Sequence, residues 1–151
     1  MKKIFFISAL LVICFANNTK AQSQPVTDTL SYLNTIVANK ASYVGKPFSV
    51  LMNDLQIQIK FFFPFADLNH DKTKETSTEF SFYFPPTAEE IYLTYPSLEI
   101  TWQTNLNATQ SRALYTQYRA LGWSNEVATF YSSGIINGNF FYFRIKKNNI
   151  K

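Results

Sequence analysis

The chain has 151 residues, of which 46% are hydrophobic and 17% aromatic, and its formal net charge is +4. This length is enough for one hydrophobic core and short for two. The positive charge comes largely from Lys2, Lys3 and Lys20, and no dense Lys/Arg patch follows them, so nucleic acid is excluded as the expected partner.

The first 21 residues have the pattern of a cleaved secretory signal peptide. Two lysines precede an apolar stretch, Ile4–Phe15, which is too short to span a bilayer whose core needs about 20 residues. Thr19-Lys20-Ala21 then offers a small-x-small cleavage site. The two alternatives are an uncleaved anchor and a lipoprotein modified at Cys14, which the bulky residues before that cysteine disfavour.

Removal of this leader changes the composition of the protein. Without its three lysines, 11 of the 14 basic residues remain against 10 acidic ones, which is a net charge of +1. The only cysteine, Cys14, is lost as well, which excludes disulfides, thiol catalysis and thiolate metal sites. We therefore expect a bacterial protein, secreted or periplasmic, without a membrane span, in which residues 22–151 form a single α+β domain with a frayed basic C-terminal tail.

Two short helices are expected at the start of this domain. Thr27 or Asp28 is suited to cap the first, which runs to about Ala41. Its apolar face comprises Leu30, Leu33, Ile36 and Val37. Pro47 suits the first turn of the second helix. The apolar residues of that helix recur at helical spacing, at Phe48, Leu51, Met52 and Leu55.

After the second helix the pattern changes to that of strands. Alternation from Leu55 to Phe65 predicts one strand, which Pro64 places at a sheet edge or ends. A polar run, Asp67–Thr78, precedes a second alternating segment, Glu79–Phe84. The two strands are expected to pair antiparallel through a long loop.

The second half of the chain predicts further strands and one helix. Residues 91–95 fit either a helical turn or a strand, and alternation over residues 98–103 predicts a strand. Asn107 or Thr109 is expected to cap a helix that ends near Gly122. Two last strands are expected as a hairpin around Asn137-Gly138, over Val127–Ser132 and Phe140–Ile145.

The resulting fold class is α+β. We expect an antiparallel or mixed sheet of about five strands, with two short N-terminal helices and one helix from the C-terminal half packed on one face.

Few residues offer catalytic chemistry. The only histidine, His70, lies in the polar run, and the chain has no G-x-S-x-G motif, so a Ser-His-Asp triad is not expected. Glu89 and Glu90 are adjacent, and Glu79 and Glu99 lie on the expected polar faces of strands. Surface acids explain all four better than a pair of glycosidase carboxylates does.

One loop raises the question of a metal. Oxygen ligands stand at alternate positions in it, at Asp67, Asn69, Asp71 and Thr73. This spacing resembles the first half of an EF-hand-type calcium loop. Lys72 occupies the position that needs glycine, and the twelfth position is Thr78. A solvated hairpin loop is the better interpretation; calcium stays open, and no other cofactor is expected.

The aromatic residues are the strongest functional signal. Four of them fall opposite the main apolar stripes of their strands: Phe62, Tyr83, Phe140 and Tyr142. They form either a second buried layer under the C-terminal helix or an exposed face that binds a protein or glycan partner.

We therefore expect an exported, non-enzymatic binding or interaction module, such as an accessory subunit of an envelope complex or an inhibitor. One alternative is a small envelope hydrolase, which requires a pocket in which two carboxylates, or His70 and a carboxylate, converge. The other is a passive structural protein of the envelope.

Overall fold

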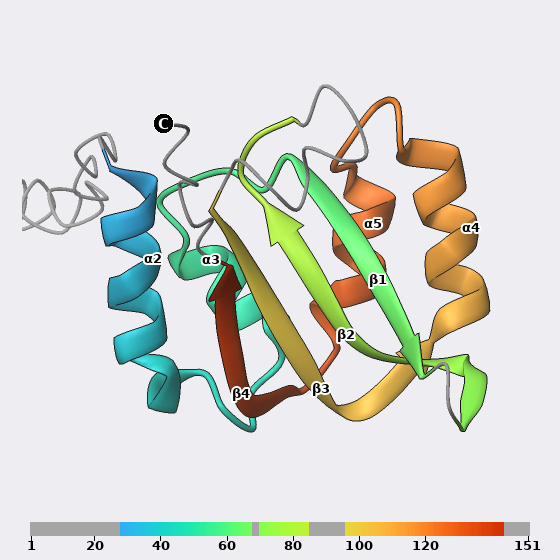
Figure 1. Ribbon diagram of the computed structural model, residues 1–151, viewed down its shortest axis with the longest axis horizontal. Helices are drawn as coiled ribbons and strands as arrows, with labels where there is room; N and C mark the ends of the chain where they lie inside the picture. Colours follow the sequence, from blue (N-terminus) through green and yellow to red (C-terminus); the bar gives the residue numbers. More distant parts are fainter. Residues whose placement is uncertain (1–27, 68–69, 85–95, 144–151) are drawn as a thin grey trace, which may run out of the picture.

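The computed structural model describes residues 28–67, 70–84 and 96–143, with side chains described as far as residue 138. The elements in chain order are α2 (Thr29–Ala38), the 3-10 helix η1 (Lys40–Ser42), α3 (Phe48–Asp54), β1 (Phe61–Asp67), β2 (Asp71–Ser81), β3 (Ser97–Asn107), α4 (Ala108–Tyr118), α5 (Asn125–Ser132) and β4 (Ile136–Phe143). The four strands form one antiparallel sheet in the order β1-β2-β3-β4 (Figure 1). The predicted α+β class is confirmed.

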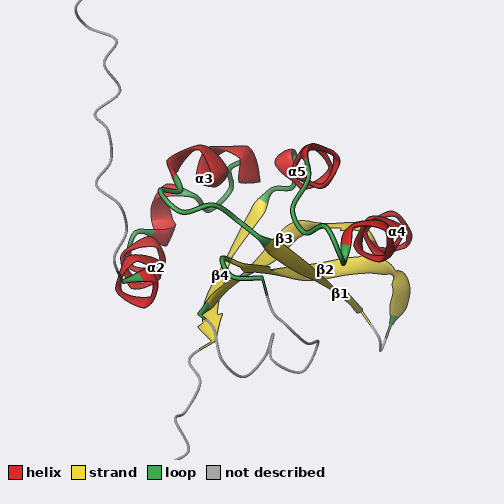
Figure 2. Cartoon of the chain, turned by 90° about the horizontal axis from the view of Figure 1, so that it is seen from above, coloured by secondary structure: helices red, strands yellow, loops and turns green. Residues whose placement is uncertain are grey.

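The helices lie on the same side of the sheet, as Figure 2 shows. Helix α4 packs against β1 and β2, whereas α2 contacts β4 at the other edge of the sheet. Helices α3 and α5 contact one another between them. The hydrophobic core therefore lies between one face of the sheet and this helical layer.

Local capping signals fix the N-terminal helices. The Asp28 carboxylate accepts a hydrogen bond from the Ser31 backbone N–H at 3.1 Å, and α2 buries Leu33 and Ile36. Pro47 precedes α3, which buries Phe48 and Leu51. Both helices were predicted from these residues, although α2 ends at Ala38 and η1 takes up the residues that follow.

The polar run was wrongly predicted as a long loop. Most of it forms β2, which begins at Asp71 and pairs along its length with β1 and β3. Its polar residues include Glu75 and Thr78, which are fully buried. Hydrogen bonds to β1 and β3 satisfy the backbone N–H and C=O groups of these residues. Pairing with two neighbouring strands therefore outweighs a composition that is typical of loops.

The predicted C-terminal hairpin is also wrong. Val127–Ser132 lies in helix α5, where Ser124 accepts from the Val127 N–H at 3.3 Å, and Val127 and Tyr131 are buried one turn apart. Asn137-Gly138 falls inside β4, which pairs with β3. Among the described residues, the second half of the chain thus has two helices, and the sheet has four strands instead of about five. Residues 91–95 lie outside the described part.

Helix α4 begins as predicted but ends at Tyr118, four residues before Gly122. Asn107 accepts from the Gln110 N–H at 3.0 Å, and Gly122 follows the helix with a φ of +80°. An added Cβ at Gly122 would lie 2.4 Å from the Lys60 carbonyl oxygen and 2.8 Å from the Phe84 ring. Glycine is therefore required both by backbone conformation and by space.

The core is rich in aromatic rings. Phe48 and Phe80 stack at 4.5 Å between ring centroids, and Trp102 and Tyr131 stack at 5.8 Å. Such contacts add to the free energy gained by burial. No helix in the described part of the chain has the length and apolar character needed to cross a bilayer.

Candidate functional site

The predicted aromatic binding residues do not share one surface. Phe62 is 1% exposed, and its ring packs against Tyr131 at 5.6 Å and Trp123 at 6.0 Å. It belongs to the buried layer under α5, which agrees with the first of the two alternatives, a second buried layer, and not with an exposed binding face. The side chains of Phe140 and Tyr142 lie outside the described part; their backbones pair with Ile100 and Leu98 of β3.

Tyr83 is exposed and belongs to a different surface. Its hydroxyl lies 3.0 Å from the Thr29 hydroxyl at the start of α2. Its neighbour Phe84 is 50% exposed, and Leu121 is 76% exposed, the highest value among the large hydrophobic side chains that the structure describes. We call Phe84 and Leu121 the apolar end patch; Tyr83 is not part of it, because its hydroxyl lies against α2.

The patch is held by contacts between three segments. The Phe84 ring packs edge-on against Phe61 at 5.8 Å, and it covers Gly122, which directly follows Leu121. Gly122 N donates to the Tyr118 carbonyl at 2.6 Å, so the turn after α4 is tight. In Figure 1 this turn and the segment after β2 both lie at the upper end of the molecule.

The possible calcium loop forms a turn with local partners. Asp67 Oδ1 accepts from the His70 backbone N–H at 3.0 Å and lies 3.1 Å from His70 Nδ1. Asp71 Oδ1 accepts from the Thr73 N–H at 3.0 Å, and its other oxygen lies 3.2 Å from Lys74 Nζ. The hydrogen bonds from Thr73 and the lysine beside it lower the pKa of Asp71.

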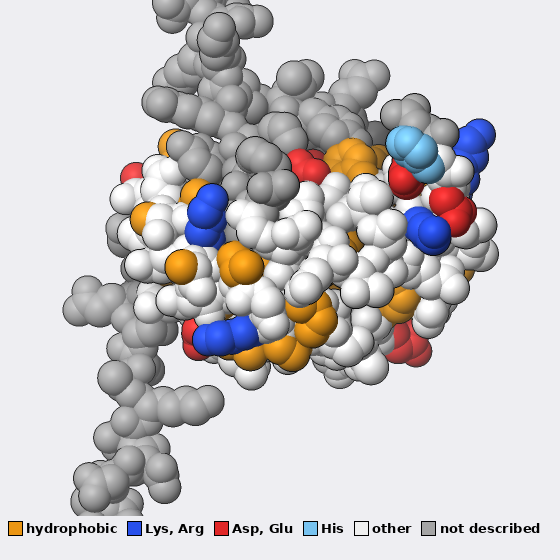
Figure 3. Space-filling view, turned by 90° about the horizontal axis from the view of Figure 1, so that it is seen from below, with side chains coloured by type: hydrophobic (Ala, Val, Ile, Leu, Met, Phe, Trp, Pro, Cys, Tyr) orange, Lys and Arg blue, Asp and Glu red, His pale blue; other side chains and the backbone are white. Residues whose placement is uncertain are grey.

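These local hydrogen bonds use carboxylate oxygens that a bound cation would need. Two of the four proposed oxygen ligands accept local hydrogen bonds, and Asn69 lies outside the described residues. Among the residues that are described, no group of three or more His, Cys, Asp or Glu side chains could hold a metal. Figure 3 shows the histidine at the surface, among acidic and basic side chains.

Glu79 and Glu99 lie directly opposite one another on β2 and β3. They point away from the helices, because Phe80 beside Glu79 packs into the core and strand neighbours alternate. Ser97 donates to Glu79 Oε1, and Ser77 donates to Glu99 Oε1 at 2.7 Å. Glu79 is only 2% exposed, so the prediction that it is a surface acid is wrong.

The environment of Glu79 favours its protonated form. Burial raises the pKa of Glu79; the Ser97 hydrogen bond opposes this rise, and the charge of Glu99 adds to it. Glu79 Oε2 is buried and has no hydrogen-bond partner among the described residues. Protonation of Glu79 would remove the repulsion between the two carboxylates that face each other.

A second buried acid, Glu75, lies within the core. Its Oε1 accepts from the Thr78 hydroxyl, which in turn accepts from Trp102 Nε1 at 2.9 Å. Burial raises the pKa of Glu75, while hydrogen bonds from Ser111 and Thr78 oppose this rise. Burial also raises the pKa of Tyr131, and the neighbouring Glu75 adds to that rise. Glu75 is fully buried, so no substrate reaches it.

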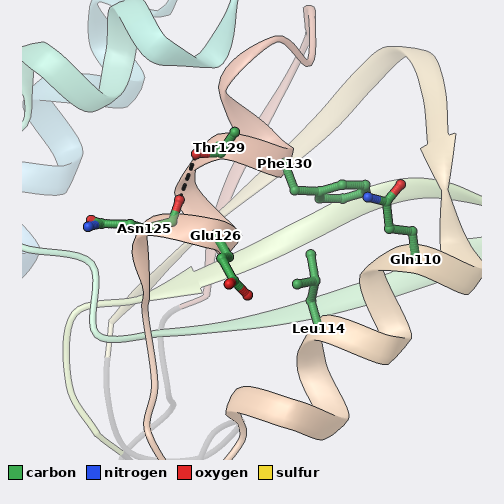
Figure 4. Close-up of a pocket in the computed structure, with 6 residues that line it drawn as sticks. All are labelled: Gln110, Leu114, Asn125, Glu126, Thr129 and Phe130. Atoms are coloured by element: carbon green, nitrogen blue, oxygen red, sulfur yellow. Dashed lines mark hydrogen bonds between the residues drawn. The ribbon is translucent and has the colours of Figure 1, made fainter.

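A shallow groove of about 430 Å³ runs between α4 and α5 (Figure 4). Leu114 and Phe130 form its apolar floor, and Glu126 is the one carboxylate that lines it. The Tyr118 hydroxyl donates to Glu126, which raises the pKa of Tyr118. The groove therefore does not bring together the two acid groups that a glycoside hydrolase needs.

Sequence reasoning missed the buried acids and most of the exposed patch. Glu75, Glu79 and Phe84 all lie in alternating or polar segments whose burial depends on partners distant in sequence. Leu121 falls within the helix that was expected to end near Gly122, but α4 ends at Tyr118. Its position next to Gly122 was the one local signal that it belongs to a turn.

Comparisons with known proteins add no assignment. No protein-family model matches the chain, and neither curated proteins nor solved structures give a significant match.

Proposed function

We propose that this protein is an exported binding module that contacts a protein partner in the cell envelope through the apolar end patch. This proposal depends on one observation: Phe84 and Leu121 are both exposed, and the Phe84 ring lies against Gly122, the residue that follows Leu121. Exposed apolar side chains that gather at one place are typical of interaction sites. The leader sequence supports export of the protein.

The chemistry of the patch favours a protein over a glycan. Sugars stack on flat aromatic faces, whereas Leu121, the most exposed member, has no such face. Protein interfaces combine aromatic rings and aliphatic side chains in their centres.

The alternative of an envelope hydrolase has less support. It requires two converging acid groups that a substrate can reach. Glu79 and Glu99 do converge, but Glu79 is buried, and the groove between α4 and α5 offers Glu126 alone.

The test compares two variants that each place a charge on an exposed hydrophobic residue. Leu121→Asp changes the patch, and Val44→Asp changes a residue that is 39% exposed shortly after η1. The segment between α2 and α3 that contains η1 reaches the lower end of the molecule in Figure 1, opposite the turn after α4. Neither substitution should alter stability by more than about 0.5 kcal/mol, because both sites are at the surface. The proteins are immobilised, and envelope extracts of the source organism are passed over them.

We expect a stoichiometric protein partner that the wild type and Val44→Asp retain and that Leu121→Asp loses. Equal retention by Leu121→Asp would show that the patch is not the binding surface. If the protein binds to a glycan resin and captures no protein partner, its ligand is a sugar and not a protein.

A further inference from the structure

Building on the proposed function, we propose that the partner's surface carries acidic side chains around the apolar group that it places on the end patch. The observation behind this inference is that two residues next to the patch, Lys60 and Arg119, have exposed cationic side chains.

Backbone contacts place Lys60 beside the patch. Its carbonyl oxygen accepts from the Trp123 N–H at 3.0 Å and lies in close contact with Gly122, between Leu121 and Trp123. The Lys60 side chain is exposed and donates to Gln58, a neutral group, so its positive charge is not compensated by this contact.

Arg119 approaches the patch from α4. It is the C-terminal cap of this helix, two residues before Leu121, and it is exposed. Helix α4 and its cap contain Arg112 and Arg119 and no acidic residue. The nearest described acid along the chain is Glu126, which already accepts from the Tyr118 hydroxyl.

The described surroundings of the patch are therefore mainly positive. In a protein interface, charges at the rim steer association and select partners of the opposite sign. Aromatic residues and arginine are also the side chains that most often dominate binding energy. An acidic protein surface with an apolar centre satisfies both features.

An anionic lipid surface is the competing occupant. Two cations contribute only weakly to lipid binding, and stable binding takes a broader apolar face or several more basic residues. The patch has two strongly exposed apolar side chains, which suits a small protein contact better than insertion into a bilayer.

The probe is a library of random, phage-displayed dodecapeptides selected on the purified protein. The best peptide is then synthesised, and its affinity is measured for the wild type and for Arg119→Glu, Arg119→Lys and Leu121→Asp. Arg112→Glu is the matched control, since it makes the same charge change on the same helix but about 10 Å further along its axis. Affinities are compared at about 0.01 M and about 1 M salt.

We expect selected peptides that combine Asp or Glu with aromatic or aliphatic residues. Arg119→Glu should weaken binding about tenfold at low salt and much less at high salt, because salt screens rim charges. Arg119→Lys should retain binding, and Arg112→Glu should have the smaller effect of the two reversals. Leu121→Asp should abolish binding.

The opposite outcomes separate this inference from the proposed function. If Leu121→Asp abolishes binding but Arg119→Glu leaves it unchanged, or if the selected peptides lack acids, the end patch remains and the acidic partner is refuted. If Leu121→Asp has no effect, the patch itself is refuted. Sedimentation with phosphatidylglycerol vesicles that Leu121→Asp abolishes would assign the surface to lipid instead.

Discussion

Gly122 is the residue on which the geometry of the end patch depends. It has a positive φ, and the Lys60 carbonyl and the Phe84 ring occupy the space that a side chain would need. Only glycine adopts this conformation readily, and only glycine lets Phe84 pack at this distance.

We predict that Gly122→Ala destabilises the protein by more than about 2 kcal/mol, since the left-handed conformation alone costs about 1–2 kcal/mol and the steric overlap adds to it. Urea denaturation measures the change. Gly45→Ala is the control, because Gly45 has a φ of +75° but no atom within 4 Å of an added Cβ. If both variants lose the same free energy of unfolding, the close approach of Lys60 and Phe84 to Gly122 does not contribute to the effect.

At the scale of single elements, α5 shows how a helix can form from residues with strand character. The β-branched and aromatic residues of Val127–Ser132 favour a strand by propensity. Ser124 satisfies the N–H of Val127, and the spacing of Val127 and Tyr131 places both side chains in the core on one helical face. The cap and the burial together outweigh the local preference.

We therefore expect Ser124→Ala to lower the free energy of unfolding by about 1 kcal/mol, which is typical for loss of an N-cap. The measurement is chemical denaturation followed by circular dichroism. Ser133→Ala, at the C-terminal end of the same helix and exposed, should change stability by less than about 0.5 kcal/mol. No loss in Ser124→Ala would argue against the capped helix.

For the whole molecule, the two buried acids set the expected dependence of stability on pH. Burial raises the pKa of Glu75 and of Glu79, and the charge of Glu99 raises that of Glu79 further. Between the unfolded pKa, about 4.3, and these raised values, the folded protein binds more protons than the unfolded chain. The free energy of unfolding therefore falls as the pH rises through that window.

The prediction is a lower urea midpoint at about pH 8 than at about pH 5. Glu79→Gln keeps an oxygen that accepts from Ser97 and places an amide opposite Glu99, so it should raise stability at neutral pH by about 1 kcal/mol and flatten the pH profile. A steeper profile in Glu79→Gln would mean that Glu79 is ionised in the folded protein.

The sequence by itself determined the features that depend on neighbouring residues. Asp28, Pro47 and Asn107 begin helices where their chemistry predicts, and Gly122 follows the end of α4. Alternation located β3, but of the strand predicted over Leu55–Phe65 only the second half is correct, because β1 begins at Phe61. These signals are local because capping and periodicity involve residues only a few positions apart.

Only the tertiary structure decided which polar residues are buried and which apolar ones are exposed. Glu79 is enclosed, Phe62 is in the core and Leu121 is outside because of contacts with segments far away in the chain. The extension of β2 through a polar run and the helix in place of a hairpin strand have the same origin. Burial and strand pairing are properties of the packed molecule, so a pattern along one segment does not determine them.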